Sequence, residues 1–310
     1  MNEPTVLILG AGASQPYGLP LGWQLRDMVI SLTTRSDIHE LSDSLGFNSL
    51  EYSKFSKALA TSGEKSVDAF LERVPIWTKI GKLGIAYCLC SLEKPTRLFP
   101  PSQPKSDHWL ETLWGLIRQE SWRKQRALPL TIVTFNYDRL VEHYLATVMA
   151  STFDVSRRVI DDYVSNSLCL HVHGSLGQYS SLTFDSMFRL SVPDLAVAGA
   201  IGIKIIHEEQ AVTAEFARAH EKIQEASRIL FLGFGFHKIN LHRLGIAKLR
   251  EKSSPAIMGT HKGIQARAWS LICRQNNFSD AASRYGGGSI SNFLNETFRF
   301  RSMRIDRDHA

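Results

Sequence analysis

The sequence predicts an α/β protein built on a Rossmann-like, doubly wound parallel sheet. Three observations indicate this fold: short runs rich in Val, Ile and Leu recur, segments with helical spacing separate them, and small or polar residues follow each run. Strands that alternate with helices pair in parallel, so their carboxyl ends lie along one edge of the sheet. We expect residues 1–310 to form a single domain.

The first run, Val6–Leu9, predicts a buried strand that turns through small residues into a helix. Such a turn brings backbone N–H groups close to a bound pyrophosphate. Gln15 stands where the usual dinucleotide fingerprint has a third Gly or Ala, and no acidic ribose-binding residue is clearly placed. The turn is therefore a variant fingerprint, and a turn without a ligand remains an alternative. The residues expected to hold the pyrophosphate are Gly10, Ala11, Gly12, Ala13 and Ser14.

A mostly helical insertion, residues 22–128, follows the first turn. Apolar side chains recur at helical spacing, convincing strands are absent, and the Pro-rich piece Lys94–Lys105 is typical of a loop between two helical halves. We expect the insertion to pack beside the sheet as a lid or an oligomerisation surface. The basic run Arg118–Arg126 is better explained as an exposed helix face than as a nucleic-acid site, so direct nucleic-acid binding is not expected.

The second run, Leu130–Thr134, is followed by Asn136 and Asp138 and then by a helix from Arg139. Open α/β sheets bind ligands at the carboxyl ends of their strands, although either polar side chain can instead cap the helix. Asp138 is able to do both.

The third run, 168–175, contains His171 and His173, which the period of a strand places on the same face. A strand-end His beside Gly and Ser suits an acid or base, and a buried His with a structural partner is the competing interpretation. No nearby Cys or carboxylate completes a metal ligand set, so we expect no metal.

The fourth and fifth runs, Arg228–Leu232 and Ala256–Gly259, complete the sheet, with a helix over about 213–226 before them. The fourth run ends in Gly-Phe-Gly-Phe and so repeats the strand-and-glycine pattern of the first. For this piece alone, a ligand turn and a tight turn without a ligand are equally consistent with the pattern. The tail after Gly286 indicates no mechanism.

The composition is that of an ordinary globular protein, with 44% apolar and 21% charged residues. The formal charge of +6 suits anionic ligands such as nucleotides, although surplus surface Lys and Arg explains it more simply. Four cysteines without a CxxC pair predict reduced thiols. No signal peptide is evident, and no run approaches the roughly 18 apolar residues of a membrane span. We therefore expect a cytoplasmic protein without membrane association.

The strand-end motifs, taken in order, resemble the sirtuin family, and more closely its bacterial sirtuin-like branch linked to NAD depletion in antiphage defence. The resemblance spans residues 5 to about 260, and the segment Ser66–Glu72 also looks like one common in that branch. It implies that Asn136 and His173, not His171, are catalytic. The other matching residues, implied to bind the nucleotide, are Gly10 to Ser14, Gly18, Leu19, Pro20, Thr134, Asp138, Gly233, Phe234, Gly235 and, just beyond that last turn, Asn240.

Two departures separate the chain from the protein-deacylating sirtuins. No cysteine lies between Cys169 and Cys273, so the four-cysteine zinc ribbon is missing, and Gly-Phe-Gly stands where deacylases have Gly-Thr-Ser. The implied function is an NAD+ glycohydrolase, which takes NAD as substrate and yields nicotinamide and ADP-ribose. An NAD-dependent deacylase or ADP-ribosyltransferase and a non-catalytic NAD or ADP-ribose sensor remain alternatives.

Cleavage of the nicotinamide–ribose bond builds positive charge on the ribose, which a site favours by fixing the sugar and supplying oriented dipoles. Asn136 can orient nicotinamide or the attacking water, and His173 can accept a proton from a ribose hydroxyl or that water. Asp138 pairs with the nicotinamide amide or the ribose, or only orders the loop. An NADase active at all times would starve its host, so we expect restraint by homo-oligomerisation or by a defence partner that contacts the insertion.

Overall fold

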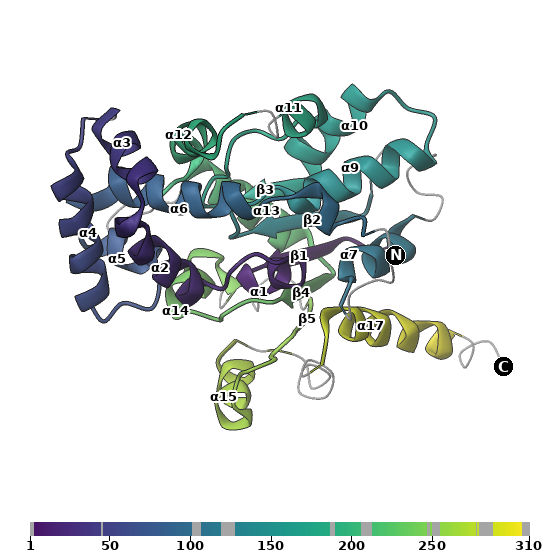
Figure 1. Ribbon diagram of the computed structural model, residues 1–310. Coiled ribbons are helices and arrows are strands. Elements are labelled where there is room, and N and C mark those ends of the chain that lie inside the picture. The colour runs from purple at the N-terminus through teal and green to yellow at the C-terminus, as the bar shows by residue number, and fades with distance from the viewer. Residues whose placement is uncertain are drawn as a thin grey trace.

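A five-stranded parallel sheet forms the centre of the computed structural model, with helices on both faces (Figure 1). Its order is β3-β2-β1-β4-β5. This is the Rossmann-like, doubly wound α/β fold that the sequence predicts. The strands are β1 Thr5–Leu9, β2 Leu130–Thr134, β3 Cys169–His171, β4 Arg228–Leu232 and β5 Ala256–Gly259. The structure describes residues 3–44, 46–100, 107–118, 128–186, 190–205, 213–246, 249, 255–276, 278 and 288–305.

The central strand β1 is buried along its whole length. Leu7 and Leu9 point into one core, and Val6 and Ile8 point into the other. Apolar cores on both faces explain why the strands are continuous apolar runs without polar alternation. The strand order runs outward in both directions from β1, so the carboxyl ends of β1 and β4 flank the switch point at which open α/β sheets bind ligands.

The described residues between β1 and β2 form helices and turns, and none of them lies in a strand. Helices α2 to α5 gather beside one end of the sheet, and α6 extends from them and packs along α12 (Figure 1). Residues 101–105 of the Pro-rich piece and 119–126 of the basic run lie outside the described residues. The helices are α1 Ala11–Ser14, α2 Gly22–Ser31, α3 Ser36–Ser44, α4 Ser49–Thr61, α5 Val67–Arg73, α6 Thr78–Leu92 and α7 Trp109–Ile117.

Helices also connect the later strands, and α13 agrees with the helix expected before the fourth strand. Among the described residues, no helix is long and apolar enough to cross a membrane. The later helices are α9 Leu140–Thr152, α10 Arg157–Tyr163, α11 Ser181–Ser186, α12 Val192–Gly202, α13 Ala214–Glu225, α14 Lys238–Arg243, α15 Ala266–Asn276 and α17 Ile290–Ile305.

The third strand is shorter than predicted, and this separates its two histidines. β3 ends at His171, whose carbonyl accepts a hydrogen bond from the Gly174 N–H (3.3 Å) across a turn. His171 lies beside α9, whereas His173 packs against Phe216 of the opposite core. The prediction that the two histidines share one face is wrong, because the turn ends the two-residue period of the strand before it reaches His173.

Candidate functional site

The two glycine turns after β1 and β4 pack directly against each other. The Gly12 N–H donates to the Gly233 carbonyl (2.9 Å), and the Ala13 N–H donates to the Gly10 carbonyl (2.9 Å). A Cβ at Gly10 or Gly12 would lie 2.7 or 2.8 Å from the backbone of Gly233. The close approach of the two turns therefore requires these glycines whether or not a ligand binds, and the amides of Gly12 and Ala13 already have acceptors within the protein.

A cleft of about 790 Å³ opens beside these turns, at the carboxyl ends of β1, β4 and β5. Its volume falls within the roughly 300–1,000 Å³ of small-molecule sites. Lys262 lines it as an exposed cation, whereas the carboxylate of Asp107 accepts the N–H groups of Ile290 and Ser291 at the start of α17. The lining residues are Gly12, Gln15, Pro16, Leu21, Asp107, Gly233, Phe234, Gly235, Thr260, Lys262, Gly263, Ile264, Gly288 and Ile290.

The cleft contains part of the predicted nucleotide-binding set, namely Gly12, Gly233, Phe234 and Gly235. The position is the switch point of the sheet, where open α/β sheets bind ligands. Lys262 supplies a charge that suits a phosphate, and sequence reasoning missed it. The sequence does contain a signal for Lys262, because this basic residue stands three positions after the fifth strand.

A buried hydrogen-bond network joins the first turn to the loop after β2. The Asn136 carboxamide nitrogen donates to the Gly10 carbonyl (3.0 Å) and to Ser14 Oγ (2.9 Å). Ser14 Oγ in turn donates to Asp138 Oδ2 (2.8 Å). A carbonyl can only accept, so the nitrogen of Asn136 faces Gly10, and both of its N–H groups are used. In the described structure Asn136 Oδ1 has no protein partner, so this side chain can accept a hydrogen bond from a ligand or a water.

Asp138 acts inside this network and binds the start of α9, since its Oδ1 accepts the Leu140 N–H (3.3 Å). The N-cap position of α9 is Arg139, so Asp138 binds this first N–H from the position before the cap. Burial, and then the charge of Glu93, raise the pKa of Asp138 to about 7, while the hydrogen bond from Ser14 opposes this rise. The carboxyl is buried and does not line the cleft. The Thr134 hydroxyl also supports the loop, because it accepts the Asn136 N–H (3.0 Å).

His173 lies on the other side of this loop in an aromatic cage. Its ring centroid is 5.3 Å from that of Phe135 and 5.9 Å from that of Phe216. Its Nε2 is buried and has no hydrogen-bond partner within the described structure. Burial, and then the charge of Arg243, lower the pKa of His173 to about 4, so the ring is neutral at pH 7. Phe135 also contacts Phe234 of the cleft (5.1 Å between centroids), which joins the cage to the cleft wall.

The remaining predicted residues take positions outside the cleft lining. Gly18 has a left-handed φ of 82°, and its carbonyl accepts from Arg97 (2.7 Å). Leu19 is buried, and Asn240 lies half-buried in α14. The others outside the lining are Gly10, Ala11, Ala13, Ser14, Pro20, Thr134, Asn136, Asp138 and His173.

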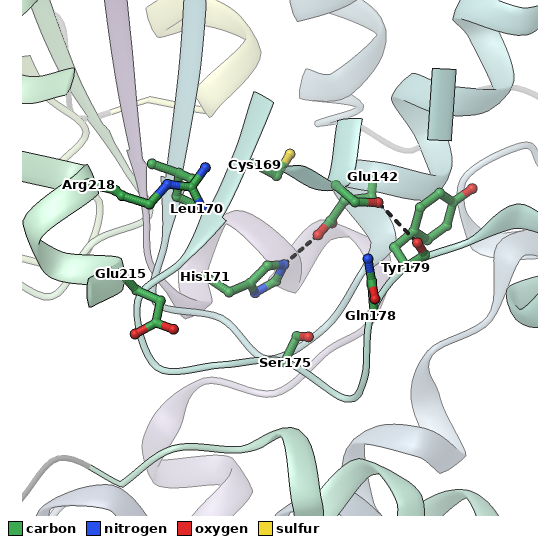
Figure 2. Close-up of a pocket in the computed structure, with 10 residues that line it drawn as sticks. Glu142, Cys169, Leu170, His171, Ser175, Gln178, Tyr179, Glu215 and Arg218 are labelled. Carbon is green, nitrogen blue, oxygen red and sulfur yellow. Dashed lines mark hydrogen bonds and ion pairs between the residues drawn. The ribbon is translucent and has the colours of Figure 1, made fainter. Parts of the chain in front are cut away.

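A second, smaller pocket of about 170 Å³ lies at the end of β3 and contains His171 and Glu142 (Figure 2). His171 Nε2 bonds to Glu142, and its Nδ1 donates to the Asn136 carbonyl (2.8 Å). The sequence prediction gave the catalytic role to His173, the histidine directly before Gly174, and gave no role to His171 or Glu142. The available signal was an acidic residue six positions after Asn136, in the first turn of the following helix.

No protein-family model and no curated protein matches this chain. The functional argument therefore rests on the fold and on these side chains. Within the described ranges, no group of three His, Cys, Asp or Glu side chains is placed to hold a metal ion.

Proposed function

We propose that the protein is an NAD+ glycohydrolase that cleaves the nicotinamide–ribose bond to give nicotinamide and ADP-ribose. The observation that carries the proposal is the state of His173. Its Nε2 is buried and lacks a partner in the described structure, so a bound substrate can supply the hydrogen bond or the proton that this nitrogen accepts. A buried polar atom without a partner is costly, which favours a role that a bound substrate completes.

The two parts of the site suit the two ends of a dinucleotide. A pyrophosphate over Gly12 and near Lys262 places the adenosine end in the cleft by β4 and β5. The other end then extends across β1 toward the loop after β2, which carries Asn136. Asn136 Oδ1 orients the attacking water, and His173 takes a proton from that water or from a ribose hydroxyl. General base catalysis of this kind contributes typically about 10² to 10⁴ in rate.

The test is NAD+ turnover, measured as nicotinamide and ADP-ribose separated by chromatography. We expect Asn136→Ala and His173→Ala each to reduce the rate at least about 10²-fold. Asn166→Ala is the matched control, because Asn166 is exposed and, among the described residues, its carboxamide bonds only to the nearby Asp162. Unchanged turnover in both site variants contradicts the proposal. An acetylated peptide that is required for nicotinamide release indicates a deacylase instead.

A second candidate function is nucleotide binding without cleavage. It is favoured by the pairing of both Asn136 N–H groups inside the protein and by the absence of Asn136 and His173 from the cleft lining. This function predicts that NAD+ or ADP-ribose binds in calorimetry and that NAD+ stays intact under every activating condition tried.

We also propose that the helical insertion restrains the enzyme, through homo-oligomerisation or through a partner protein in antiphage defence. Exposed apolar side chains such as Trp23 in α2 and Ile76 after α5 support a contact surface there. Light scattering at assay concentrations tests the idea. A monomer that hydrolyses NAD+ at full rate without a partner contradicts it.

A further inference from the structure

A buried ion pair lies directly behind Asn136. His171 at the end of β3 bonds through Nε2 to Glu142 of α9 (Figure 2). Through Nδ1 it donates to the backbone oxygen of Asn136 (2.8 Å). The side chains of His171 and Glu142 are 13% and 3% exposed, so water competes little for either bond.

The partners of the ring decide its charge. The Asn136 carbonyl can only accept, so His171 Nδ1–H donates to it, and a proton on Nε2 completes an ion pair with Glu142. Burial opposes this charge, but the Glu142 carboxylate outweighs it and raises the pKa of His171 above its ordinary value. His171 therefore has no nitrogen left to take a proton from a substrate, which is the opposite of the state of His173.

Within the part of the chain that the structure describes, every polar atom of Asn136 except Oδ1 has a hydrogen-bond partner. Its N–H donates to Thr134 Oγ1, its carboxamide nitrogen donates to Gly10 and Ser14, and its carbonyl accepts from His171. Only the bond from His171 comes from a charged group, and such bonds are shorter and stronger than neutral ones. The imidazolium thus fixes the peptide from which the carboxamide projects.

We infer that His171, paired with Glu142, is a positioning residue that holds the Asn136 peptide and so aims Asn136 Oδ1 at the water or hydroxyl of the reaction. The inference rests on the proposed hydrolysis of NAD+. It concerns the orientation of Asn136 and assigns His171 no proton transfer.

The other charged groups around His171 leave this pairing intact. Asp138 adds to the negative field that favours the imidazolium. Glu215 and Arg218 of α13 line the same pocket, but Glu215 pairs with Lys204, and Arg218 donates to the Asn166 carbonyl (2.7 Å). Glu142 is therefore the group that holds the charge on His171.

The test compares three variants in steady-state NAD+ hydrolysis. His171→Phe keeps a planar ring and removes both donors, and we expect it to lower kcat by about 10²-fold with KM nearly unchanged, because the cleft is untouched. Glu142→Leu leaves a neutral His171 whose Nδ1–H can still reach the Asn136 carbonyl, so its loss of kcat should be smaller. Glu142→Gln should keep kcat within about threefold, since an amide N–H can donate to a neutral His171 while Nδ1–H still donates to Asn136.

The wild-type kcat should also fall at alkaline pH, as the imidazolium loses its proton, and this fall should be absent in Glu142→Gln.

A second measurement separates this inference from the proposed function. Nitrogen-15 NMR of histidine-labelled protein should show one ring with both nitrogens protonated above pH 7, and His171→Phe or Glu142→Leu should remove that signal. A wild-type protein that leaves NAD+ intact contradicts the proposed function and with it the catalytic part of the inference. An unchanged kcat in a folded His171→Phe variant overturns the positioning role, and a neutral His171 in the wild type at pH 7 overturns the ion pair with Glu142.

Discussion

At the scale of the residue, the two histidines of one short segment have pKa values that are shifted in opposite directions. His171 faces the Glu142 carboxylate, which raises its pKa, whereas His173 lies among aromatic rings near Arg243, where burial lowers its pKa to about 4. Both side chains are largely buried, so the neighbouring charge makes the difference. The Nε2 of His173 has no partner in the described structure, whereas both ring nitrogens of His171 are bonded within the protein.

The lowered pKa of His173 makes folding stability depend on pH. The unfolded chain protonates this ring near its ordinary value of about 6.5 and the folded protein only near 4, so the stability it contributes is lost as the pH falls through this window. His173→Phe keeps a ring in the cage but cannot be protonated. Between pH 7 and pH 4, the free energy of unfolding of the wild type should fall by roughly 3 kcal/mol more than that of this variant. Urea unfolding of both proteins at each pH measures the difference, and a difference that does not change with pH contradicts the lowered pKa.

The contact between the two glycine turns predicts a strong effect at one position. Gly233 has φ +58°, and a Cβ there would lie 2.1 Å from the Ala13 nitrogen. We expect Gly233→Ala to destabilise the fold by at least about 1–3 kcal/mol, because it adds backbone strain and pushes the turns apart. Gly235→Ala is the control, since its Cβ would meet only the His237 side chain. Equal denaturation midpoints for the two variants contradict the packing argument.

At the scale of the element, α5 links the insertion to both halves of the site. Asp68 accepts from the Tyr137 hydroxyl, next to Asn136, and Glu72 pairs with Arg243 of α14 (3.1 Å). The two acids are four residues apart and therefore lie on one face of the helix. The segment Ser66–Glu72 thus has a structural role: it ties the insertion to the Asn136 loop and to α14.

Asp68 should stabilise the fold mainly through the hydrogen bond that it accepts from Tyr137, and only a little through its charge. Burial raises the pKa of the Asp68 carboxyl, so replacement by a neutral amide costs little, whereas truncation leaves the Tyr137 hydroxyl buried without its acceptor. We expect Asp68→Ala to lose about 1–3 kcal/mol of stability and Asp68→Asn clearly less. Chemical denaturation of the two variants measures this, and equal losses would show that the hydroxyl finds another partner.

The bounds of a strand could be predicted from the sequence where neighbouring residues alone determine them. The β2, β4 and β5 runs were predicted with the bounds observed, because a buried strand is a continuous apolar run. The end of β3 was not predicted, because the turn that follows it packs on a distant part of the chain. Gly174 of that turn lies so close to α12 that a Cβ there would be 2.0 Å from the carbonyl of Gly202. The pairing of Glu142 with His171 likewise depends on how α9 packs against β3. Pattern alone also does not separate a glycine that contacts a ligand from one that contacts another turn.

At the scale of the whole molecule, the central strand β1 divides the candidate site. The cleft lies toward β4 and β5, and the Asn136 network lies toward β2, with the turn after β1 contributing Gly12 to the first and Ser14 to the second. A dinucleotide that crosses this turn contacts both sides. Binding and cleavage therefore involve different side chains, and substitutions should separate them.

This separation predicts distinct effects on ADP-ribose binding. A ligand that binds only the folded state at 100 times its Kd adds about 2.7 kcal/mol of stability, so saturating ADP-ribose should raise the Tm of the wild type. Lys262→Ala removes the exposed cation of the cleft and should weaken binding about tenfold, the loss expected for one charge-assisted contact to phosphate.

The controls for this experiment come from the other side of β1 and from the surface. Asn136→Ala should keep the Kd for ADP-ribose within about threefold, because Asn136 does not line the cleft, and Lys222→Ala should leave it unchanged, since that lysine lies on α13 and pairs with Glu225. Isothermal calorimetry gives each Kd directly. Equal weakening by Lys262→Ala and Lys222→Ala would mean that phosphate binds elsewhere, and a larger loss in Asn136→Ala than in Lys262→Ala would place the nucleotide on the β2 side of the sheet.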